Sequence, residues 1–212
     1  MGLIEWLLGE EPSIFEQMLH DDKGELAEYL IEYAVSNDNI EGYTRVLKNV
    51  YLPTSYGKAT EIDVILLTEK YIFVYESKNY SGWIFGSAKQ KYWTQCLTNK
   101  EHNRFYNPIM QNETHIKALC KLLQLDRGKF KSMIVFSERC ELKKVPEDTE
   151  QVLIFKRNKT IDRTNETMWF EPEIFTNEEI DRIYDILHQY ENAPEDVKQK
   201  HIDNIKNNRR CT

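Results

Sequence analysis

Cysteine and histidine spacings typical of a zinc or redox site are missing from the sequence. The four cysteines lie far apart, and none forms a Cys-x-x-Cys pair. No two of the five histidines have the i, i+4 spacing of a helical zinc site. We therefore expect free thiols in a reducing compartment and no zinc centre.

Long apolar runs are missing as well. No run approaches the ~20 residues that a membrane-spanning helix needs, and the opening MGLIEWLLGEEP carries acidic rather than basic residues, unlike a signal peptide. Tracts rich in glycine or proline are absent, while 41% of the residues are hydrophobic and 30% are charged. A chain of 212 residues with this composition suits one cytoplasmic domain with short extensions and no membrane contact.

Positive charge is scarce overall but concentrated in one segment. The formal net charge is −7. Residues 78–131 carry 10 Lys and Arg against 3 Asp and Glu, whereas residues 1–77 carry 5 against 15. Because a nucleic-acid partner requires Lys and Arg to neutralise its phosphates, we expect Lys89, Lys91 and Arg104 of this segment to contact one. The alternative is a solvated positive face without a partner.

The hydrophobic periodicity predicts an α/β fold in which helices cover both faces of one mixed β-sheet. Ser13 and Thr176 begin capping boxes, and the helix starting at 23 has an apolar stripe with Glu28 on its flank. Residues 88–108 give no clear pattern. The expected helices cover residues 14–19, 23–36, a stretch after Pro108 and 177–190, and the expected strands cover 43–52, 61–67, 72–78, 131–137 and 151–155, with a short edge strand after Lys78.

The stretch 61–78, EIDVILLTEKYIFVYESK, is apolar and yet carries charged side chains. If its two strands form a hairpin in which opposed residue numbers sum to 139, Asp63 faces Glu76. Lys78 follows two residues after Glu76 and points to the same face. Since a buried charge is costly unless it is paired, hydrogen-bonded or bound to a metal, we expect these three side chains to share one site.

Two neighbouring carboxylates repel each other unless one is protonated or a cation lies between them. Mg²⁺ or Mn²⁺ could take Asp63 and Glu76 as ligands and keep waters that phosphate oxygens can replace. Lys78 could then orient a water or stabilise charge on a phosphate. The alternative is a salt bridge from Lys78 to one of the acids at a strand end, without catalysis.

The arrangement of Asp63 and Glu76-Ser77-Lys78 resembles the D…E-x-K core of the PD-(D/E)xK nuclease superfamily. Over about residues 22–125 the chain is more specifically similar to the nuclease-related domain (NERD) family. One departure is Ala27, where the family pattern has a glycine. The matching features, in order, are Lys23-Gly24 before Glu28, Thr60-Glu61-Ile62-Asp63, Glu76-Ser77-Lys78-Asn79 followed by Gly82 and Gly86, and Asn107-Pro108 followed by Gln111 and His115.

The resemblance implies a restriction-endonuclease-like core and a metal-dependent nuclease site. The metal would be held by both acids of the motif, Asp63 and Glu76, and by the backbone carbonyl of Ser77. For Gln111 and His115 the alternatives are a helix cap and a surface histidine. The catalytic residues implied are Glu28, Asp63, Glu76, Lys78 and Gln111.

We therefore expect a nuclease that hydrolyses phosphodiester bonds, with DNA the favoured substrate and Mg²⁺ or Mn²⁺ the cofactor. The alternatives are a non-catalytic nucleic-acid-binding module of the same fold and an interaction subunit of a larger complex, and a homo-oligomer or a partner protein is left open. The expected segments are a helical extension (1–22), the nuclease-like domain (23–170) and a C-terminal helix with a polar tail (171–212). The aromatic residues Trp83, Tyr92, Trp93 and Phe105 are expected in the core rather than on a base-stacking surface.

Overall fold

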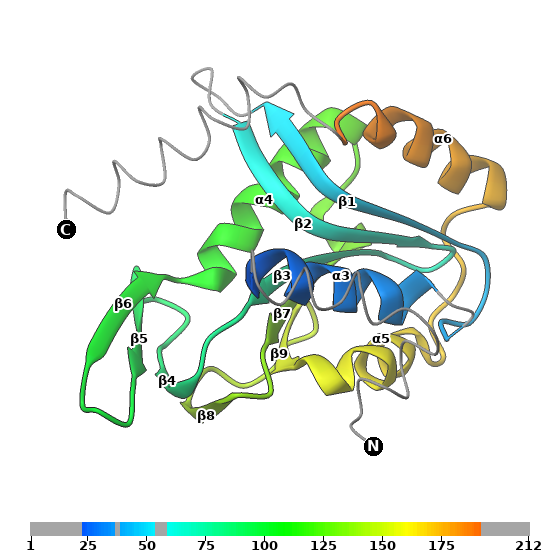
Figure 1. Cartoon of the computed structure of the whole chain (residues 1–212). Coiled ribbons are helices and arrows are strands. Elements are labelled where there is room, and N and C mark those ends of the chain that lie inside the picture. Colours follow the sequence, from blue (N-terminus) through cyan, green and yellow to red (C-terminus); the bar gives the residue numbers. More distant parts are fainter. Residues whose placement is uncertain (1–22, 37–38, 54–58, 192–212) are drawn as a thin grey trace, which may run out of the picture.

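The computed structural model describes residues 23–36, 39–53 and 59–191, so the helix expected at 14–19 and the polar tail lie outside the described residues (Figure 1). A five-stranded sheet has the order β1–β2–β3–β7–β9. The pairs β1–β2 and β2–β3 are antiparallel, whereas β3–β7 and β7–β9 are parallel, so the sheet is mixed as expected. Its strands are β1 (Thr44–Pro53), β2 (Ala59–Thr68), β3 (Ile72–Lys78), β7 (Phe130–Phe136) and β9 (Val152–Lys156).

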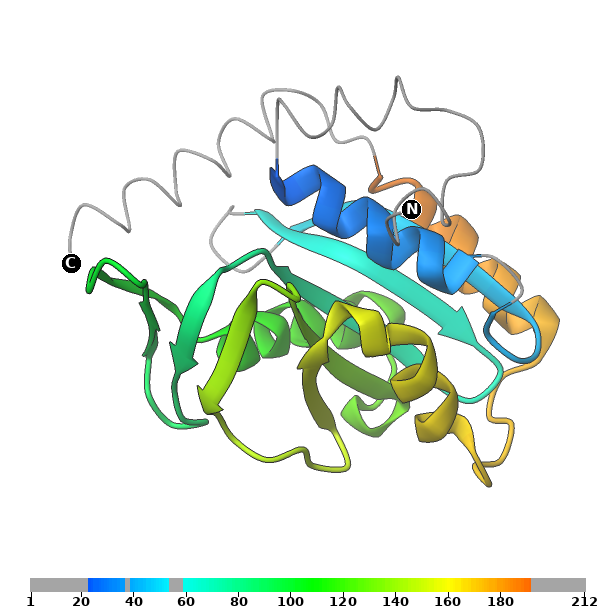
Figure 2. The same cartoon turned by 60° about the horizontal axis from the view of Figure 1, so that its bottom comes forward.

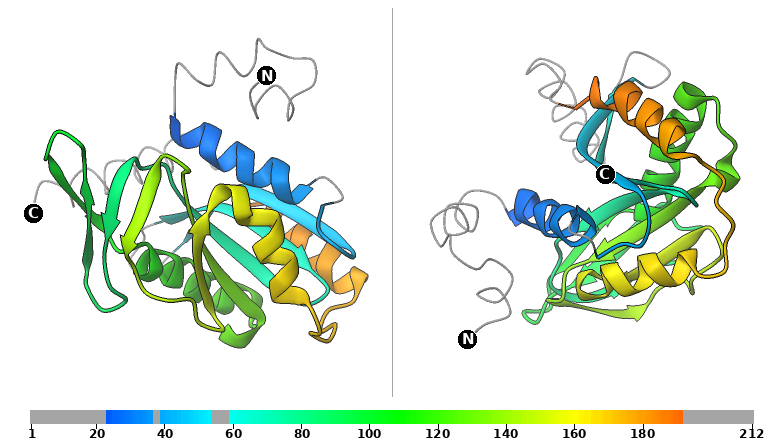
Figure 3. Two further views of the ribbon diagram at one scale, coloured as in Figure 1. Left: turned by 90° about the horizontal axis from the view of Figure 1, so that it is seen from below. Right: turned by 90° about the vertical axis from the view of Figure 1, so that its right-hand side faces the viewer.

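Helices cover both faces of this sheet, as predicted (Figure 3). Successive side chains of a strand point to opposite faces, and both sets are apolar here. Ile65 packs with Ile116 of α4 on one face, while Val64 packs with Ile31 of α3 on the other. The helices are α3 (Lys23–Ser36) and α5 (Thr160–Met168) on one face and α4 (Pro108–Leu123) and α6 (Asn177–His188) on the other, with short 3-10 turns at Arg127–Lys129 and Arg157–Lys159. None of the helices in the described ranges is both long and apolar enough to span a lipid bilayer.

A second, four-stranded sheet lies at one end of the molecule, so the expectation of a single sheet was wrong (Figures 2 and 3). Its order is β6–β5–β4–β8, and its inner face packs against the end of β7. The ring of Trp93 stacks on Phe136 with centroids 6.2 Å apart. The strands are β4 (Gly82–Phe85), β5 (Tyr92–Cys96), β6 (His102–Tyr106) and β8 (Cys140–Lys144).

The expected core placement of the four aromatic residues holds only in part. Trp93 and Phe105 are buried, but Tyr92 is half-buried and Trp83 is 52% exposed. The alternation of the strands explains the division, because Trp93 pairs with Phe105 on the inner face while its neighbour Tyr92 points outward. The placement of Trp83 in the core was therefore wrong.

Two glycines of this sheet are required by close approach. Gly82 has a φ of +75°, and a Cβ there would lie 2.3 Å from the carbonyl oxygen of Cys96 on the paired strand. A Cβ on Gly86 would lie 2.2 Å from the ring of Trp93. Both glycines thus have a packing reason, independent of any chemistry.

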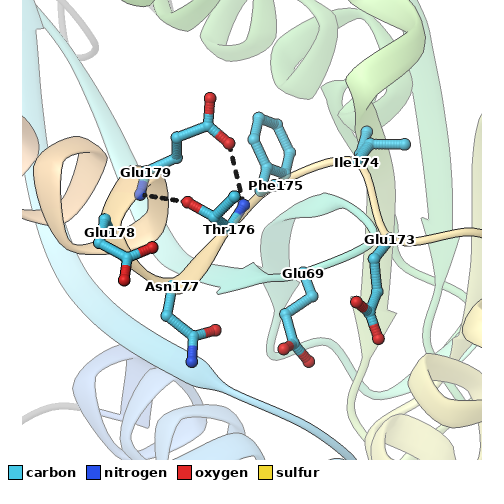
Figure 4. A pocket seen from close by; sticks show the side chains of 8 residues that line it. All are labelled: Glu69, Glu173, Ile174, Phe175, Thr176, Asn177, Glu178 and Glu179. Atoms are coloured by element: carbon cyan, nitrogen blue, oxygen red, sulfur yellow. Dashed lines mark hydrogen bonds between the residues drawn. The ribbon is translucent and has the colours of Figure 1, made fainter.

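The capping box expected at Thr176 is present. Thr176 Oγ1 accepts a hydrogen bond from the Glu179 N–H, and the Glu179 carboxylate accepts one from the Thr176 N–H (Figure 4). The helix that follows, α6, ends at His188 rather than at 190. Its buried side chains Ile180, Ile183 and Leu187 belong to the core cluster of the large sheet.

Candidate active site

The β2–β3 hairpin carries the motif acids at the end away from its turn. The observed pairs, from Val64 with Tyr75 to Leu67 with Ile72, all have numbers that sum to 139, so the predicted register is confirmed. Asp63 comes directly before the last pair and Glu76 directly after it. Asp63 Oδ2 accepts a hydrogen bond of 2.7 Å from the backbone N–H of Ser77. The two acids therefore lie side by side at the open end of the hairpin.

The backbone of Ser77 faces the same opening. In an extended strand the N–H and C=O of one residue point to the same edge. The N–H of Ser77 points to Asp63, whereas the carbonyl of Lys78 accepts from Ser137 on the other edge. The Ser77 carbonyl is thus directed toward the edge where Asp63 lies.

Glu76 is an almost fully buried carboxylate whose two oxygens both have partners. Its side chain is 1% exposed. Oε1 pairs with the ammonium of Lys78, and Oε2 lies 3.0 Å from His115 Nε2. Burial alone would raise the pKa of Glu76, but Lys78 and His115 outweigh it and the pKa is lowered. Glu76 is therefore held as an anion.

Lys78 is held as a cation by the same contacts. Burial would lower the pKa of its ammonium, but the charges of Glu76 and Asp63 outweigh burial and raise it. Its Nζ also donates to Gln111 Oε1 at 3.2 Å. The amine is thus fixed between a strand and helix α4.

The pKa of Asp63 is shifted in the direction opposite to that of Glu76. Its pKa lies well above the ordinary value, chiefly because the carboxyl is buried, and then because Glu76 and Glu28 are close enough to repel its charge. The attraction of Lys78 and the hydrogen bond from Ser77 do not compensate. Glu28, half-buried on α3, therefore contributes negative charge to this site, on the side opposite to α4.

Helix α4, on the face of the large sheet opposite to α3, supplies further polar side chains to the site. Gln111 and His115 are one turn apart and contact Lys78 and Glu76, respectively. Gln111 is not a helix cap, because Asn107 caps this helix. His115 is not a surface histidine, because it is only 2% exposed. An ionised carboxylate only accepts, so His115 Nε2 must carry the proton that it donates to Glu76.

A buried polar network supports this helix and was missed by the sequence reasoning. His115 Nδ1 lies 2.7 Å from Thr60 Oγ1 on β2. Asn112 Nδ2 donates to the Val74 carbonyl at 2.8 Å and to Ser132 Oγ at 2.9 Å. The sequence signal for this network was Asn112, a polar residue one turn before Ile116 on the apolar stripe of the helix.

The three basic residues expected to bind nucleic acid lie apart from this cluster. Lys89, Lys91 and Arg104 are all exposed. Lys91 Nζ and the Arg104 guanidinium lie 5.4 and 4.8 Å from the ring centre of Tyr92, on the second sheet. The structure thus brings Glu28, Asp63, Glu76, Lys78 and Gln111 into one site, and no contact joins the three cations to it among the described residues.

The described part of the chain holds no ready-made metal cage, the acidic cluster included. Within the described ranges, no group of three or more His, Cys, Asp or Glu side chains is arranged to hold a metal ion. A pocket of about 510 Å³ lies before α6, next to Glu69 in the turn of the β2–β3 hairpin and so at the far end from Glu76 (Figure 4). Its lining includes four glutamates and no Lys or Arg, so it would repel phosphate.

Comparisons with known proteins show the family of the chain. The family model described as "nuclease-related domain" (NERD) matches residues 23–137, just over half of the chain. An uncharacterized protein of Bacillus anthracis is 34% identical over 188 residues, which cover 87% of this chain and 84% of that protein. No solved structure matches the chain. The matched segment contains the whole acidic and lysine cluster together with α4, and the chain belongs to the nuclease-related domain family.

Proposed function

We propose that the protein is a metal-dependent nuclease that hydrolyses phosphodiester bonds, with DNA the favoured substrate. The observation that carries this proposal is the convergence of Asp63, Glu76 and Lys78 at the open end of one hairpin. Membership of a nuclease-related family supports the same chemistry.

The donor set fits a hard divalent cation. Asp63, Glu76 and the Ser77 carbonyl offer only oxygen atoms, which Mg²⁺ and Mn²⁺ prefer. Among the described residues no hydrogen bond engages Asp63 Oδ1. The pKa of this carboxyl is raised first by burial and then by the charges of Glu76 and Glu28, which a cation would neutralise. A bound ion would polarise the scissile phosphate and lower the pKa of a bound water. Because that ion must displace a proton from Asp63, metal affinity should fall as pH decreases.

The chain's own residues have separate roles in this proposal. Lys78, kept protonated by the acids, is placed to stabilise negative charge on the phosphate and to orient a water. Gln111 fixes the direction of that amine through its hydrogen bond. His115 holds the Glu76 carboxylate in place from α4. Glu28 adds negative charge next to Asp63 and would strengthen the attraction for a cation.

A second candidate is a binding module that does not cut nucleic acid. It is favoured by one observation, namely that both oxygens of Glu76 already have protein partners, Lys78 and His115. Such a closed ion-pair network can be purely structural. In that case the site would bind no metal, and the lysine would serve only to neutralise a buried acid.

Cleavage assays separate the two candidates. Labelled single-stranded, duplex and branched DNA, and RNA, would be incubated with the full chain and Mg²⁺, Mn²⁺ or EDTA. We expect product only with a divalent ion, and a loss of at least 100-fold in Asp63→Asn and in Lys78→Met. Lys117→Ala, an exposed lysine on α4, is the matched control and should retain activity.

The outcomes are distinct. Cleavage that persists in both site variants would mean that the activity belongs to another site or to a contaminant. No product with any ion, combined with salt-dependent binding that Lys78→Met leaves unchanged, would support the binding module instead.

A further inference from the structure

We propose that the outer face of the four-stranded sheet binds single-stranded nucleic acid by stacking bases on exposed aromatic rings. This surface, here called the stacking face, consists of Trp83, Phe85, Tyr92, Arg104 and Tyr106. The idea that this face delivers a nucleic-acid strand to the candidate active site rests on the proposed function. The binding of nucleic acid to the face does not.

The strand register places these side chains on one face. Tyr92 is directly opposite Tyr106, and their rings meet edge to face with centroids 6.2 Å apart. Trp83 is opposite Cys96, which is four residues beyond Tyr92 on β5 and therefore on the same side. The intervening residues, such as Trp93, point inward to the core.

The rings are exposed without a structural need. Trp83 is 52% exposed and Tyr106 is 40% exposed, and both are among the few large apolar side chains that lie open within the described chain. A tryptophan in the middle of a strand normally packs its ring on a neighbour. Bases are the ligand that a flat, open ring surface suits, because every base has a π-face.

Cations are interleaved with the rings, which favours a nucleic acid over a protein partner. The Arg104 guanidinium lies 4.8 Å from the centre of the Tyr92 ring, and Lys143 Nζ lies 5.2 Å from that of Trp83. The acidic residue of this face, Glu141, is neutralised by Lys143 at 2.5 Å. Phosphates would therefore meet the positive charge of Arg104 next to the Tyr92 ring, as a single strand requires.

The stacking face is joined to the candidate active site by a short link. Only residues 79–81 separate Lys78 from the start of β4. Within this link, the ring of Tyr80 packs on that of Phe105 on β6, with centroids 4.4 Å apart. On the other side, Asn107 caps α4 and donates from its side chain to three carbonyls of the loop before β5. A nucleic-acid strand bound to the stacking face would thus lie next to the candidate active site.

Binding can be measured without cleavage. Fluorescence anisotropy of a labelled dT12 oligonucleotide would be recorded with the full chain in EDTA at several salt concentrations. We expect Trp83→Ala and Tyr106→Ala each to weaken binding roughly 5- to 100-fold. Arg104→Ala should make the plot of the log of the binding constant against log salt concentration less steep by about 0.7.

The matched control is Trp169→Ala. Trp169 is 55% exposed, as open as Trp83, but it lies in the α5–α6 connection, at the opposite end of the molecule from β5 and β6 (Figure 3). Its loss should change the Kd by less than about twofold, and thermal melting would show that all variants remain folded. An abasic dodecamer with the same charge should bind at least tenfold more weakly than dT12.

Several results would overturn the inference. One is equal binding of dT12 by the wild type, Trp83→Ala and Tyr106→Ala; another is equal binding of dT12 and the abasic strand. A third is an oligomer of the chain that Trp83→Ala dissociates, with no binding of dT12, since the face would then contact protein. Lys78→Met separates this inference from the proposed function, because it should bind dT12 normally and yet not cleave.

Discussion

Replacing Asp63 by asparagine should make the metal-free protein more stable while abolishing the proposed cleavage. Asparagine has nearly the same shape, and its carbonyl oxygen can still accept the hydrogen bond from the Ser77 N–H. What disappears is a buried negative charge that lies near Glu76 and Glu28. A residue kept despite this cost would be expected at a functional site.

The size of the effect follows from the charges around the carboxyl. At a separation of about 5 Å and an effective dielectric constant of about 20, repulsion from Glu76 amounts to about 3 kcal/mol, and attraction to Lys78 offsets a similar amount. Burial and Glu28 leave a net penalty of about 2–3 kcal/mol. Loss of charge assistance in the Ser77 hydrogen bond costs about 1 kcal/mol. Asp63→Asn should therefore raise the free energy of unfolding by about 1–2 kcal/mol.

The pH dependence provides an independent check. Because the folded-state pKa of Asp63 is raised, this group favours folding below its ordinary pKa and opposes folding once the pH exceeds the raised value. The advantage of Asp63→Asn should therefore be small near pH 4 and grow toward pH 8. In EDTA at pH 8 we expect a Tm higher by about 2–8 °C, measured by circular dichroism.

The reasoning would be refuted by a variant that melts below the wild type in EDTA at pH 8. It would also be refuted by a difference in Tm that does not vary between pH 4 and pH 8, because the effect would then not arise from a titrating carboxyl. Glu113→Gln, at a partly exposed acid on α4, serves as the control and should not raise the Tm in EDTA at pH 8.

Other substitutions test single contacts. His115→Ala removes one partner of the buried motif glutamate and should lower the free energy of unfolding in urea by about 2–4 kcal/mol, whereas His102→Ala, at the surface, should not. Gly86→Ala would push a methyl group into the Trp93 ring, so we expect a loss of about 1–3 kcal/mol and a changed near-UV spectrum; an unchanged spectrum would contradict this packing. Thr176→Ala removes a helix cap and should cost about 1 kcal/mol, which an unshifted urea midpoint would rule out.

The hairpin and its acids could be predicted from sequence because their pattern leaves little freedom. Both strands of the hairpin are apolar on both faces, and shifting the register by one residue would move Asp63 and Glu76 to opposite faces. The helix starting at Lys23 was also predicted with its observed bounds. In both cases periodicity and charge placement act over a short stretch of chain.

The second sheet could not be predicted for the opposite reason. Its strands have only four or five residues, and their outward positions carry rings that look like core residues in a linear sequence. Whether Trp83 or Trp93 faces inward depends on how β4 pairs with β5 and with β8, and β8 is distant in sequence. The His115 network likewise depends on β2 meeting α4, a contact across 55 residues.

The late strands β8 and β9 determine how the protein can be shortened. β8 completes the small sheet by pairing with β4, and β9 completes the large sheet by pairing with β7. A fragment cut at the end of the family match, Ser137, would therefore expose two unpaired strand edges at once. Open edges recruit other chains by strand addition. Truncated forms of this protein should consequently aggregate even when every residue of the candidate active site is retained.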